Sequence, residues 1–578
     1  MEYKILNHLD EIIDAYAEPI QITDGLYFDQ KDTLKRIEFY SNSKYLSGDK
    51  DELGRDKPFY NICNYRVTVA KTATDLDVKD IKFEPESLKD SVATMLYNKE
   101  LFKYLKESNF SQTLNEMGLT RPKYGGVLVK KSEDENGALK IEVVDWKNLS
   151  VDPSDILGGV IIETHYLQAS ELSKQSDVWD EKEIKELLKA HNKANKNKPA
   201  RIEVKEVTGE FPKSFNPDEE DTDKNKYDYQ RMCFYIGVVN QKKFLLHYEV
   251  EDKMEYKYLP WERMPGRGLG RGVMEDGFQA QIGTNDTIIS MKNVMELSTK
   301  VIVSTNSKKL SGNAIVGMQT GHIIELEDAT RTINSLNLAP SSYPALGENI
   351  ELWNSQYDRS ASTYDANTGE APTAGTPYSQ TALLNQVANS PFEYRREEWG
   401  IFLNEIMNDW IFPYLKRKIL KKHDLVAEFD DEELAMIDEA IANSEGKKLI
   451  IDNLTKGEVT TPEEVNGMKD GVTEELGKVG KKRSITIPEK FLDIKGRITC
   501  NITGELKNKQ ATLQSLDSIL KTIQVTFNPN TGSFAALDDP RLSKLFGQIV
   551  ELSGVPITFG QLKGKAPQPP QPVAPIPA

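Results

Sequence analysis

A long helical pattern begins directly after a glycine-rich loop. From Val273 to Leu297 no proline occurs, and apolar residues recur at roughly helical spacing. The main apolar stripe consists of Met274, Phe278, Ile282 and Ile289. The polar positions between them carry few charges, which suits a helix that is packed on most of its sides. The pattern predicts a long helix, and it leaves open whether that helix packs within one large domain or against copies of itself.

Residues 1 to about 165 alternate between helical and strand patterns. Helices are predicted over Asp32–Leu46 and Leu88–Met117. Strands are predicted over Tyr65–Val69, Gly126–Lys130 and Leu139–Val144. Asn136-Gly137 separates the last two strands, and both residues tolerate positive φ, so a tight hairpin is expected there.

The middle of the chain carries a small group of predicted strands between two predicted helices. The first helix covers Glu181–Ala194, and the second is the long helix after the glycine loop. The strands between them are Ile202–Val207, Met232–Val239 and Phe244–Val250. This order predicts a helical hairpin with a β module at its far end. The acidic run Pro217–Asp223 inside the module could bind a divalent cation, but it is more typical of a solvated loop tip.

The chain then alternates short strands with two further helices. Strands are predicted at Val301–Ser304, Ala314–Met318 and His322–Leu326, and a helix at Glu348–Tyr364. The segment from Asp365 to Pro377 supports neither period and predicts a loop. Helix resumes over Tyr378–Lys422, with a kink or fresh start at Pro391 and an apolar stripe that consists of Trp399, Leu403, Ile406 and Trp410.

Residues 430 to 560 have the pattern of a smaller, α-rich module. Helices are predicted at Asp431–Asn443, Pro462–Lys469, Lys507–Ile523 and Pro540–Ser553, with a strand at Arg497–Ile502. The proline-rich segment 564–578 is predicted to be disordered or polyproline-like.

Composition narrows the possible functions. Among 578 residues, 73 are basic and 90 acidic, and the resulting net charge of −17 argues against a protein that grips nucleic acid by neutralising phosphates. The three cysteines lie far apart, which fits neither a zinc site nor a disulfide scaffold and favours a reducing compartment. Neither a signal peptide nor a membrane-length apolar run is recognisable, so we expect a soluble protein made inside the cell.

Motifs that carry chemistry are weak. The loop Gly266–Gly272 has glycines at every second position, which does not fit a dinucleotide-binding loop, and Gly560–Ala566 only approaches a phosphate-binding loop. The six histidines do not cluster in sequence. We therefore predict no catalytic residue, no metal and no cofactor.

The order of these elements resembles that of the portal proteins of tailed bacteriophages. Four phrases carry the resemblance further: Lys57–Asn61, Glu206–Glu210, Gly268–Gly272 and Gly369–Ala374. The resemblance implies an α+β, portal-like fold with a mixed α/β wing, a helical stem, a small β-rich clip, a long kinked helix and an α-rich crown. Its parts would be the N-terminal wing (1–168), the first stem helix region (169–200), the clip (201–260), the second stem helix (266–299), the C-terminal strands and helix of the wing (300–364), the tunnel loop (365–377), the long kinked wing helix (378–425), the crown (426–563) and a disordered proline-rich tail (564–578).

The resemblance also implies roles for particular residues. The loop lining a DNA channel would contain Asp365, Ala366, Asn367, Thr368, Gly369, Glu370, Ala371, Pro372 and Thr373. Stem packing would use Met274, Phe278, Ile282 and Ile289. The surface of the clip that binds partners would contain Asp218, Glu219, Glu220, Asp221, Lys242 and Lys243.

By this resemblance the chain is a structural protein and not an enzyme. It would form a ring of about a dozen copies at one capsid vertex, as a head-to-tail connector through which DNA is packaged and ejected. Its partners would be itself, the terminase packaging motor, a tail adaptor, the major capsid or scaffold protein, and double-stranded DNA that passes without sequence recognition. It would be assembled in the host cytoplasm, reside in the virion and contact no membrane. The alternatives are another structural head or adaptor protein, or a nucleotide-dependent enzyme that uses the Gly266–Gly272 loop.

Overall fold

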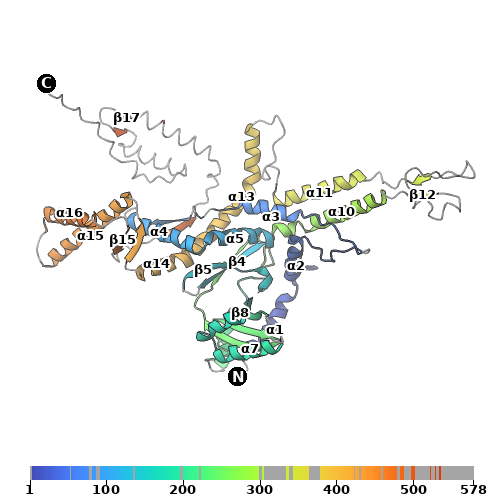
Figure 1. The fold of residues 1–578 in the computed structure, drawn as a ribbon, viewed down its shortest axis with the longest axis horizontal. Coiled ribbons are helices and arrows are strands. Elements are labelled where there is room, and N and C mark those ends of the chain that lie inside the picture. Colours follow the sequence, from blue (N-terminus) through green and yellow to red (C-terminus); the bar gives the residue numbers. More distant parts are fainter. Residues whose placement is uncertain are drawn as a thin grey trace, which may run out of the picture. The chain divides into compact units, whose positions relative to one another are not determined.

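In the computed structural model (Figure 1), the chain consists of two compact units, Met1–Cys500 and Asn501–Ala578. The structure describes residues 3–51, 54–76, 78, 81–85, 91–133, 137–194, 200–219, 223–298, 302–304, 334–336, 343–363, 378–421, 424–428, 431–456, 460–477, 482–486, 496–500, 521, 527–528 and 533–534. In the second unit, β17 (Phe527–Asn528) pairs antiparallel with β18 (Ser533–Phe534). All elements below belong to the first unit.

A five-stranded antiparallel sheet, in the order β10-β9-β8-β7-β6, is packed on both faces. Its strands are β6 (Leu149–Ser150), β7 (Ile161–Leu167), β8 (Ile202–Pro212), β9 (Tyr229–Val239) and β10 (Lys242–Val250). One face packs against Ile5 and Leu9 of α1 (Lys4–Ala17), and the other against Ile184 and Leu187 of α7 (Glu181–Ala194). A tight turn at Asn240-Gln241 joins β9 to β10, and both of its residues have positive φ, 48° and 66°.

A second, three-stranded sheet has the order β11-β4-β5. Its strands are β4 (Gly126–Glu133), β5 (Leu139–Val143) and β11 (Tyr256–Pro260). The predicted hairpin between β4 and β5 is confirmed, and Gly137 in its turn has a φ of +71°. The helix predicted over Leu88–Met117 is two helices, α4 (Ser91–Glu107) and α5 (Phe110–Tyr124), because Asn109 between them takes a left-handed conformation.

The strand predicted at Tyr65–Val69 is wrong, because these residues lie in helix α3 (Cys63–Ala73). Val67 and Val69 are β-branched and alternate with polar residues, which gave the strand pattern. Tertiary packing favours a helix instead, because Cys63, Val67 and Ala70 recur at helical spacing and are buried in the main hydrophobic core. The other short N-terminal elements are β1 (Ile20–Thr23), β2 (Leu26–Phe28), α2 (Gln30–Ser41), β3 (Ile81–Pro85), α6 (Ala169–Lys174) and α8 (Asp223–Tyr227).

Strands within residues 201–260 pair with strands on the other side of the predicted boundaries. β8 pairs along its length with β7, which was placed in the preceding part, and β11 pairs with β4 of the other sheet. The backbone hydrogen bonds of a strand need a neighbouring strand, and here that neighbour lies across the predicted border. The helix α7 packs on this sheet, so the predicted hairpin between it and the long helix is wrong as well.

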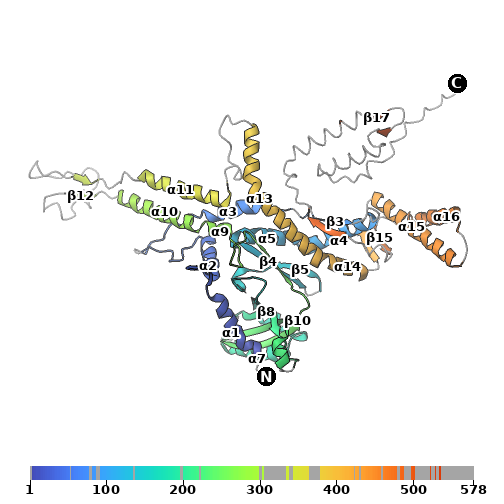
Figure 2. The ribbon, with the colours of Figure 1, turned by 180° about the vertical axis from the view of Figure 1, so that it is seen from behind.

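The long helix pairs instead with the helix that follows it. It begins as α9 (Val273–Asp276) and, after Gly277, continues as α10 (Phe278–Ser298), beside which α11 (Tyr343–Ala361) runs (Figures 1 and 2). Between α10 and α11, strands β12 (Ile302–Ser304) and β13 (Asn334–Leu336) pair antiparallel. The predicted strand Val301–Ser304 is thereby confirmed for its described part, whereas Ala314–Met318 and His322–Leu326 lie outside the described residues.

A long helical stretch runs from Tyr378 to Lys421. It consists of α13 (Tyr378–Ile406), a π-helical segment (Met407–Ile411) and α14 (Phe412–Lys421). Helix continues through Pro391, and α13 changes direction along its length in both views (Figures 1 and 2). The predicted apolar stripe is buried throughout, at Trp399, Leu403, Ile406 and Trp410.

The region after Lys421 contains a helical pair and two strand pairs. α15 (Asp431–Lys456) packs on α16 (Pro462–Gly477), and both are longer than predicted. β14 (Asp424–Glu428) pairs with β15 (Lys482–Thr486). β16 (Gly496–Cys500) pairs with β3, so a strand of the predicted crown is hydrogen-bonded to a strand of the predicted wing. The predicted helix at Pro540–Ser553, the predicted helix at Lys507–Ile523 apart from Lys521, and the tail 564–578 lie outside the described residues.

Within the described ranges, no helix combines the length and the apolar character needed to cross a membrane.

Candidate functional site

The backbone of the glycine loop Gly266–Gly272 lies in close contact with the backbone at the end of α5. A Cβ atom added to Gly270 would lie 2.3 Å from the carbonyl oxygen of Gly125, and one added to Gly272 would lie 2.6 Å from its nitrogen. Gly125 itself has a φ of +90°. The alternating glycines therefore allow two backbone segments to touch.

The amide groups of this loop already donate hydrogen bonds to the protein. The N–H groups of Gly268, Gly270 and Arg271 donate to the Pro153 carbonyl (2.8 Å), the Tyr258 hydroxyl (2.9 Å) and the Glu262 carbonyl (2.9 Å). A phosphate-binding loop presents such N–H groups to its ligand. The loop geometry therefore gives no support to the nucleotide-binding alternative and indicates an anchor for the helix that follows.

Helices α10 and α11 form an antiparallel hairpin with small residues facing large ones. A Cβ at Gly277 would lie 2.2 Å from Cζ of Tyr357, and a Cβ at Gly283 would lie 2.4 Å from Cε2 of Trp353. Further along, the Asn349 amide donates to the Thr287 hydroxyl at 3.1 Å. Contacts that advance along α10 move back along α11, so the two axes run antiparallel and close together.

Arg66 of α3 ties the base of this hairpin to the N-terminal part of the chain. Its guanidinium donates to a carboxylate oxygen of Asp358 at 2.7 Å and to the Asn354 carbonyl at 3.2 Å, and it lies 4.5 Å from the centroid of the Tyr357 ring. The Tyr357 hydroxyl donates in turn to the Val273 carbonyl at 2.8 Å. Burial raises the pKa of this hydroxyl well above its usual value. These contacts fix the end of α11 against the start of the long helix.

The uncharged polar face of α10 holds the segment that contains the Lys57–Asn61 phrase. Gln281 accepts the Ile62 N–H at 3.0 Å and donates to the Tyr60 carbonyl at 2.6 Å. Asn285 accepts the Tyr60 N–H at 3.0 Å. The side-chain amides thus satisfy the backbone of an extended segment that has no sheet partner there. The sequence indicated a packed polar face, and its partners are this segment and, at Thr287, the helix α11.

The four predicted stem-packing residues have two different environments. Met274 and Phe278 are buried in the main core, where Phe278 makes an edge-on contact with Tyr40 at 5.6 Å between ring centroids. Ile282 is half-buried against the same core, and Ile289 is half-buried further along α10. This stripe therefore anchors the base of the hairpin within its own chain.

The hairpin also exposes large apolar side chains. Leu352 of α11 is 57% exposed, and Met295 of α10 is 52% exposed. On α13, Tyr394 and Ile401 are exposed as well.

The predicted clip residues are not brought together. Asp218 and Glu219 lie in the loop before β9, whereas Lys242 and Lys243 follow the turn after it, so the two groups are at opposite ends of an 11-residue strand. The Lys243 ammonium binds Asp10 at 2.7 Å. These residues therefore do not form one partner-binding surface, and Glu220 and Asp221 lie outside the described residues. The predicted channel loop, Asp365 to Thr373, lies outside them too.

Sequence reasoning missed a buried charged cluster between the two sheets. Nε2 of His165 lies 3.0 Å from Glu206, the Lys130 ammonium contacts Glu206, and the same ammonium lies 3.8 Å from Glu163. Burial opposes ionisation of Glu206, but hydrogen bonds from His165 and Lys130 outweigh it and lower the pKa of Glu206 to about 2. The Glu206 hydrogen bond likewise overcomes burial and raises the pKa of His165. Three strands supply this cluster, so no spacing in the sequence shows it.

Two groups of side chains within the described ranges have the types and spacing of metal ligands. They are Glu163, His165 and Glu206, and Cys233, Glu249 and Glu251. The Lys130 ammonium already neutralises the first group. In the second, burial raises the pKa of Cys233, which disfavours the thiolate that metals bind. We therefore assign no metal to either group.

Comparison with protein-family models gives no match, and comparison with the sequences of curated proteins gives none either.

Proposed function

We propose that this chain is a portal subunit of a tailed bacteriophage, a structural protein that assembles into a ring around a DNA channel. The observation that carries the proposal is the order of elements around the hairpin. An anchored helix, a strand pair and an antiparallel helix are followed by the Gly/Pro segment 364–377 and then by a long bent helix. The resemblance implies the order stem, clip, stem, wing strands and helix, tunnel loop and kinked helix, and we propose to read the hairpin as the stem, so that the separate wing element before the tunnel loop is dropped.

The proposal changes which residues have these roles. The stem becomes α10 and α11, the clip becomes the segment 299–342 between them, and the five-stranded sheet joins the wing. Residues 365–377 keep the role of tunnel loop, and α13 to α14 that of the kinked wing helix. The crown would begin near β14 and include α15 and α16.

Exposed apolar side chains support assembly into a ring, and the net charge supports the passage of DNA. The apolar side chains exposed on the hairpin and on α13 would be covered by neighbouring copies, because exposed apolar surface often marks an interaction site. The net charge of −17 would let DNA pass without strong binding to the channel wall.

Imaging and mass measurement of the purified full-length chain test the proposal. We expect closed rings of about a dozen copies with a central hole. Leu352→Asp should prevent ring formation and leave the fold of the subunit intact, because Leu352 is 57% exposed in the single chain. Val178→Asp is the matched control, since Val178 is 67% exposed and lies away from the hairpin.

A protein that stays monomeric at micromolar concentration, or forms assemblies without a central hole, would contradict the portal proposal. If Leu352→Asp forms rings equally well, ring assembly is supported, but the hairpin is not part of the interface between subunits. An increase in thermal stability on addition of ATP and magnesium would instead favour the nucleotide-dependent alternative.

A further inference from the structure

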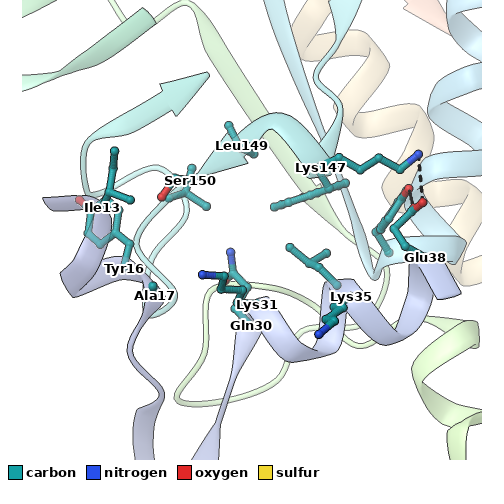
Figure 3. Close-up of a pocket in the computed structure, with 14 residues that line it drawn as sticks. Ile13, Tyr16, Ala17, Gln30, Lys31, Lys35, Glu38, Lys147, Leu149 and Ser150 are labelled. Carbon is teal, nitrogen blue, oxygen red and sulfur yellow. Dashed lines mark hydrogen bonds and ion pairs between the residues drawn. The ribbon is translucent and has the colours of Figure 1, made fainter. Parts of the chain in front are cut away.

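A cavity of about 430 Å³ lies between α1, α2 and the segment Trp146–Val151 (Figure 3). Its volume falls in the range of about 300 to 1,000 Å³ that is usual for small-molecule sites. The apolar side chains that line it are Ile13, Leu34, Trp146, Leu149 and Val151. No lining residue comes from α10 or α11, so the cavity is separate from the hairpin to which we assign ring assembly.

Gln30 in the wall of this cavity has an unsatisfied amide. The residue is only 8% exposed, and its Oε1 atom is sealed from solvent with no hydrogen-bond partner in the described part of the chain. Buried amides without a partner are uncommon in folded proteins. Figure 3 shows Gln30 beside Lys31 on α2, across the cavity from Leu149 and Ser150. This oxygen accepts hydrogen bonds, so only a ligand group that donates one would satisfy it, whereas an anion would accept from the N–H group of the same amide.

The charges around the cavity favour an anion. Lys31 and Lys35 are exposed one helical turn apart, and no carboxylate within the described ranges pairs with either. Like charges at this spacing repel each other.

The one acid among the lining residues, Glu38, does not balance these two charges. Lys147 lies 2.9 Å from its carboxylate and Lys123 lies 3.1 Å away. The Tyr124 hydroxyl donates to the same carboxylate. Although burial opposes ionisation, these partners hold the pKa of Glu38 below its usual value. Glu38 is therefore a paired anion, and the two lysines on α2 keep their positive charges for another partner.

We propose that this cavity binds a small amphipathic anion, a carboxylate or phosphate carried on an apolar chain or ring. The anionic head would accept hydrogen bonds from the Lys31 and Lys35 ammonium groups and from the N–H group of the Gln30 amide. The apolar body would lie against Leu34, Leu149 and Val151. A head of this charge relieves the repulsion between the two lysines, and the apolar wall accounts for the rest of the volume.

Three ten-carbon probes test the proposal by calorimetric titration of the full-length protein. Decanoate and decyl phosphate carry the anionic head, and decanol lacks it. We expect saturable binding of both anions, with decanol at least about tenfold weaker, because charge-assisted hydrogen bonds are lost. The tighter of the two anions identifies the preferred head group. Failure of both anions to bind at millimolar concentration, or equal affinity for decanol, would overturn the proposal.

Variants locate the binding within the protein. The double substitution Lys31→Gln and Lys35→Gln should weaken anion binding by about tenfold or more and abolish its dependence on salt. Gln30→Met, which keeps the side-chain volume, should weaken it further. Lys189→Gln changes an exposed lysine on α7 and should have no effect. Circular dichroism checks that each variant is folded, and unchanged anion affinity in the folded double variant would place binding elsewhere and reject this site.

Discussion

Gly283 of α10 lies directly against the indole of Trp353 on α11, so close that a Cβ at position 283 would be 2.4 Å from Cε2 of the ring. One turn and a half earlier, Gly277 has the same relationship with the ring of Tyr357. The hairpin therefore depends on two glycines that admit two large rings. Because helical glycines are otherwise unfavourable, the presence of Gly283 in α10 and of Gly277 just before it is explained by the approach of α11.

Alanine at these glycines should separate the two helices. We expect Gly283→Ala to lower the free energy of unfolding of the hairpin by about 1 to 3 kcal/mol, because the added methyl overlaps a large ring. Gly347→Ala is the matched control, since a Cβ there meets no atom within 4 Å. That control should be neutral or stabilising by about 0.5 to 1 kcal/mol. Hydrogen exchange along α10 and α11 measures both changes, and equal protection in the two variants would refute the predicted contact.

The side-chain amides of α10 lead to a second prediction. Asn285→Ala should destabilise the packing of the Tyr60 segment by about 1 to 3 kcal/mol, because the Tyr60 N–H loses its acceptor. Asn293→Ala removes the same side chain from an exposed position on the same helix and should have little effect. Limited proteolysis within residues 44–62 reports the difference. Equal cleavage rates in both variants would mean that this segment does not depend on α10.

Sequence periodicity predicted elements better than it predicted their partners. The long helix, the buried stripe that begins at Trp399 and the strands from Ile202 to Val250 follow from local spacing alone. The partner of the long helix does not, because Gly283 and Trp353 are separated by a segment whose length the pattern does not constrain. The glycine loop shows the same limit, since Gly125 lies far earlier in the chain and nothing local connects the two.

The partners of the charged residues in the candidate site were even harder to predict from the sequence. The phrase that begins at Glu206 was noted in the sequence, but its environment depends on Lys130 from another sheet and on His165 from the neighbouring strand. In a chain with 90 acidic residues, one glutamate on an alternating strand is unremarkable. Only strand register and the packing of the two sheets single it out.

This buried cluster gives a third prediction. Lys130→Met should destabilise the contact between the two sheets by about 3 to 5 kcal/mol, because it removes a cation beside the buried Glu206 carboxylate. Combining it with Glu206→Gln should recover part of that loss, since the unpaired charge is then removed. Lys140→Met, at an exposed ion pair on β5, should cost no more than about 0.5 kcal/mol. Denaturant unfolding of these variants and of Glu206→Gln alone measures the coupling, and strictly additive losses would contradict a direct interaction.

His165 in the same cluster should make stability fall as the solution becomes alkaline. Because Glu206 raises the pKa of His165 in the folded chain, the folded state holds this proton more tightly than the unfolded state. The resulting stabilisation is complete below pH 6.5, the ordinary pKa, and is lost as the pH rises through the higher folded value. His165→Gln should remove this dependence, and thermal unfolding followed from pH 5.5 to 9 detects it. A His165→Gln profile parallel to that of the unsubstituted protein would show that the imidazole does not contribute.

Glu251 should also make stability fall as the pH rises, because it is a carboxylate whose ionisation is unfavourable in the folded state. Its Oε2 atom is buried without a hydrogen-bond partner in the described part of the chain, and burial together with Glu255 and Glu249 raises its pKa to about 7. A raised carboxyl pKa means that the folded state favours the protonated form, so stability is lost as the pH rises from the ordinary value of 4.5 through about 7. Glu251→Gln keeps the shape and cannot ionise. The free energy of unfolding of the variant should exceed that of the unsubstituted protein by about 1 to 2 kcal/mol above pH 7 and equal it below pH 4.5.

Hydrogen exchange at β10, measured across this pH range, distinguishes a local carboxylate from a general effect of charge. Glu133→Gln removes an exposed carboxylate from β4 and should change the exchange little at any pH. Because the chain carries a net charge of −17, removing any one acid could relieve some repulsion, and the control measures that contribution. If Glu133→Gln gains as much stability, or if the gain of Glu251→Gln persists below pH 4.5, burial of the Glu251 carboxylate is not the cause of the gain.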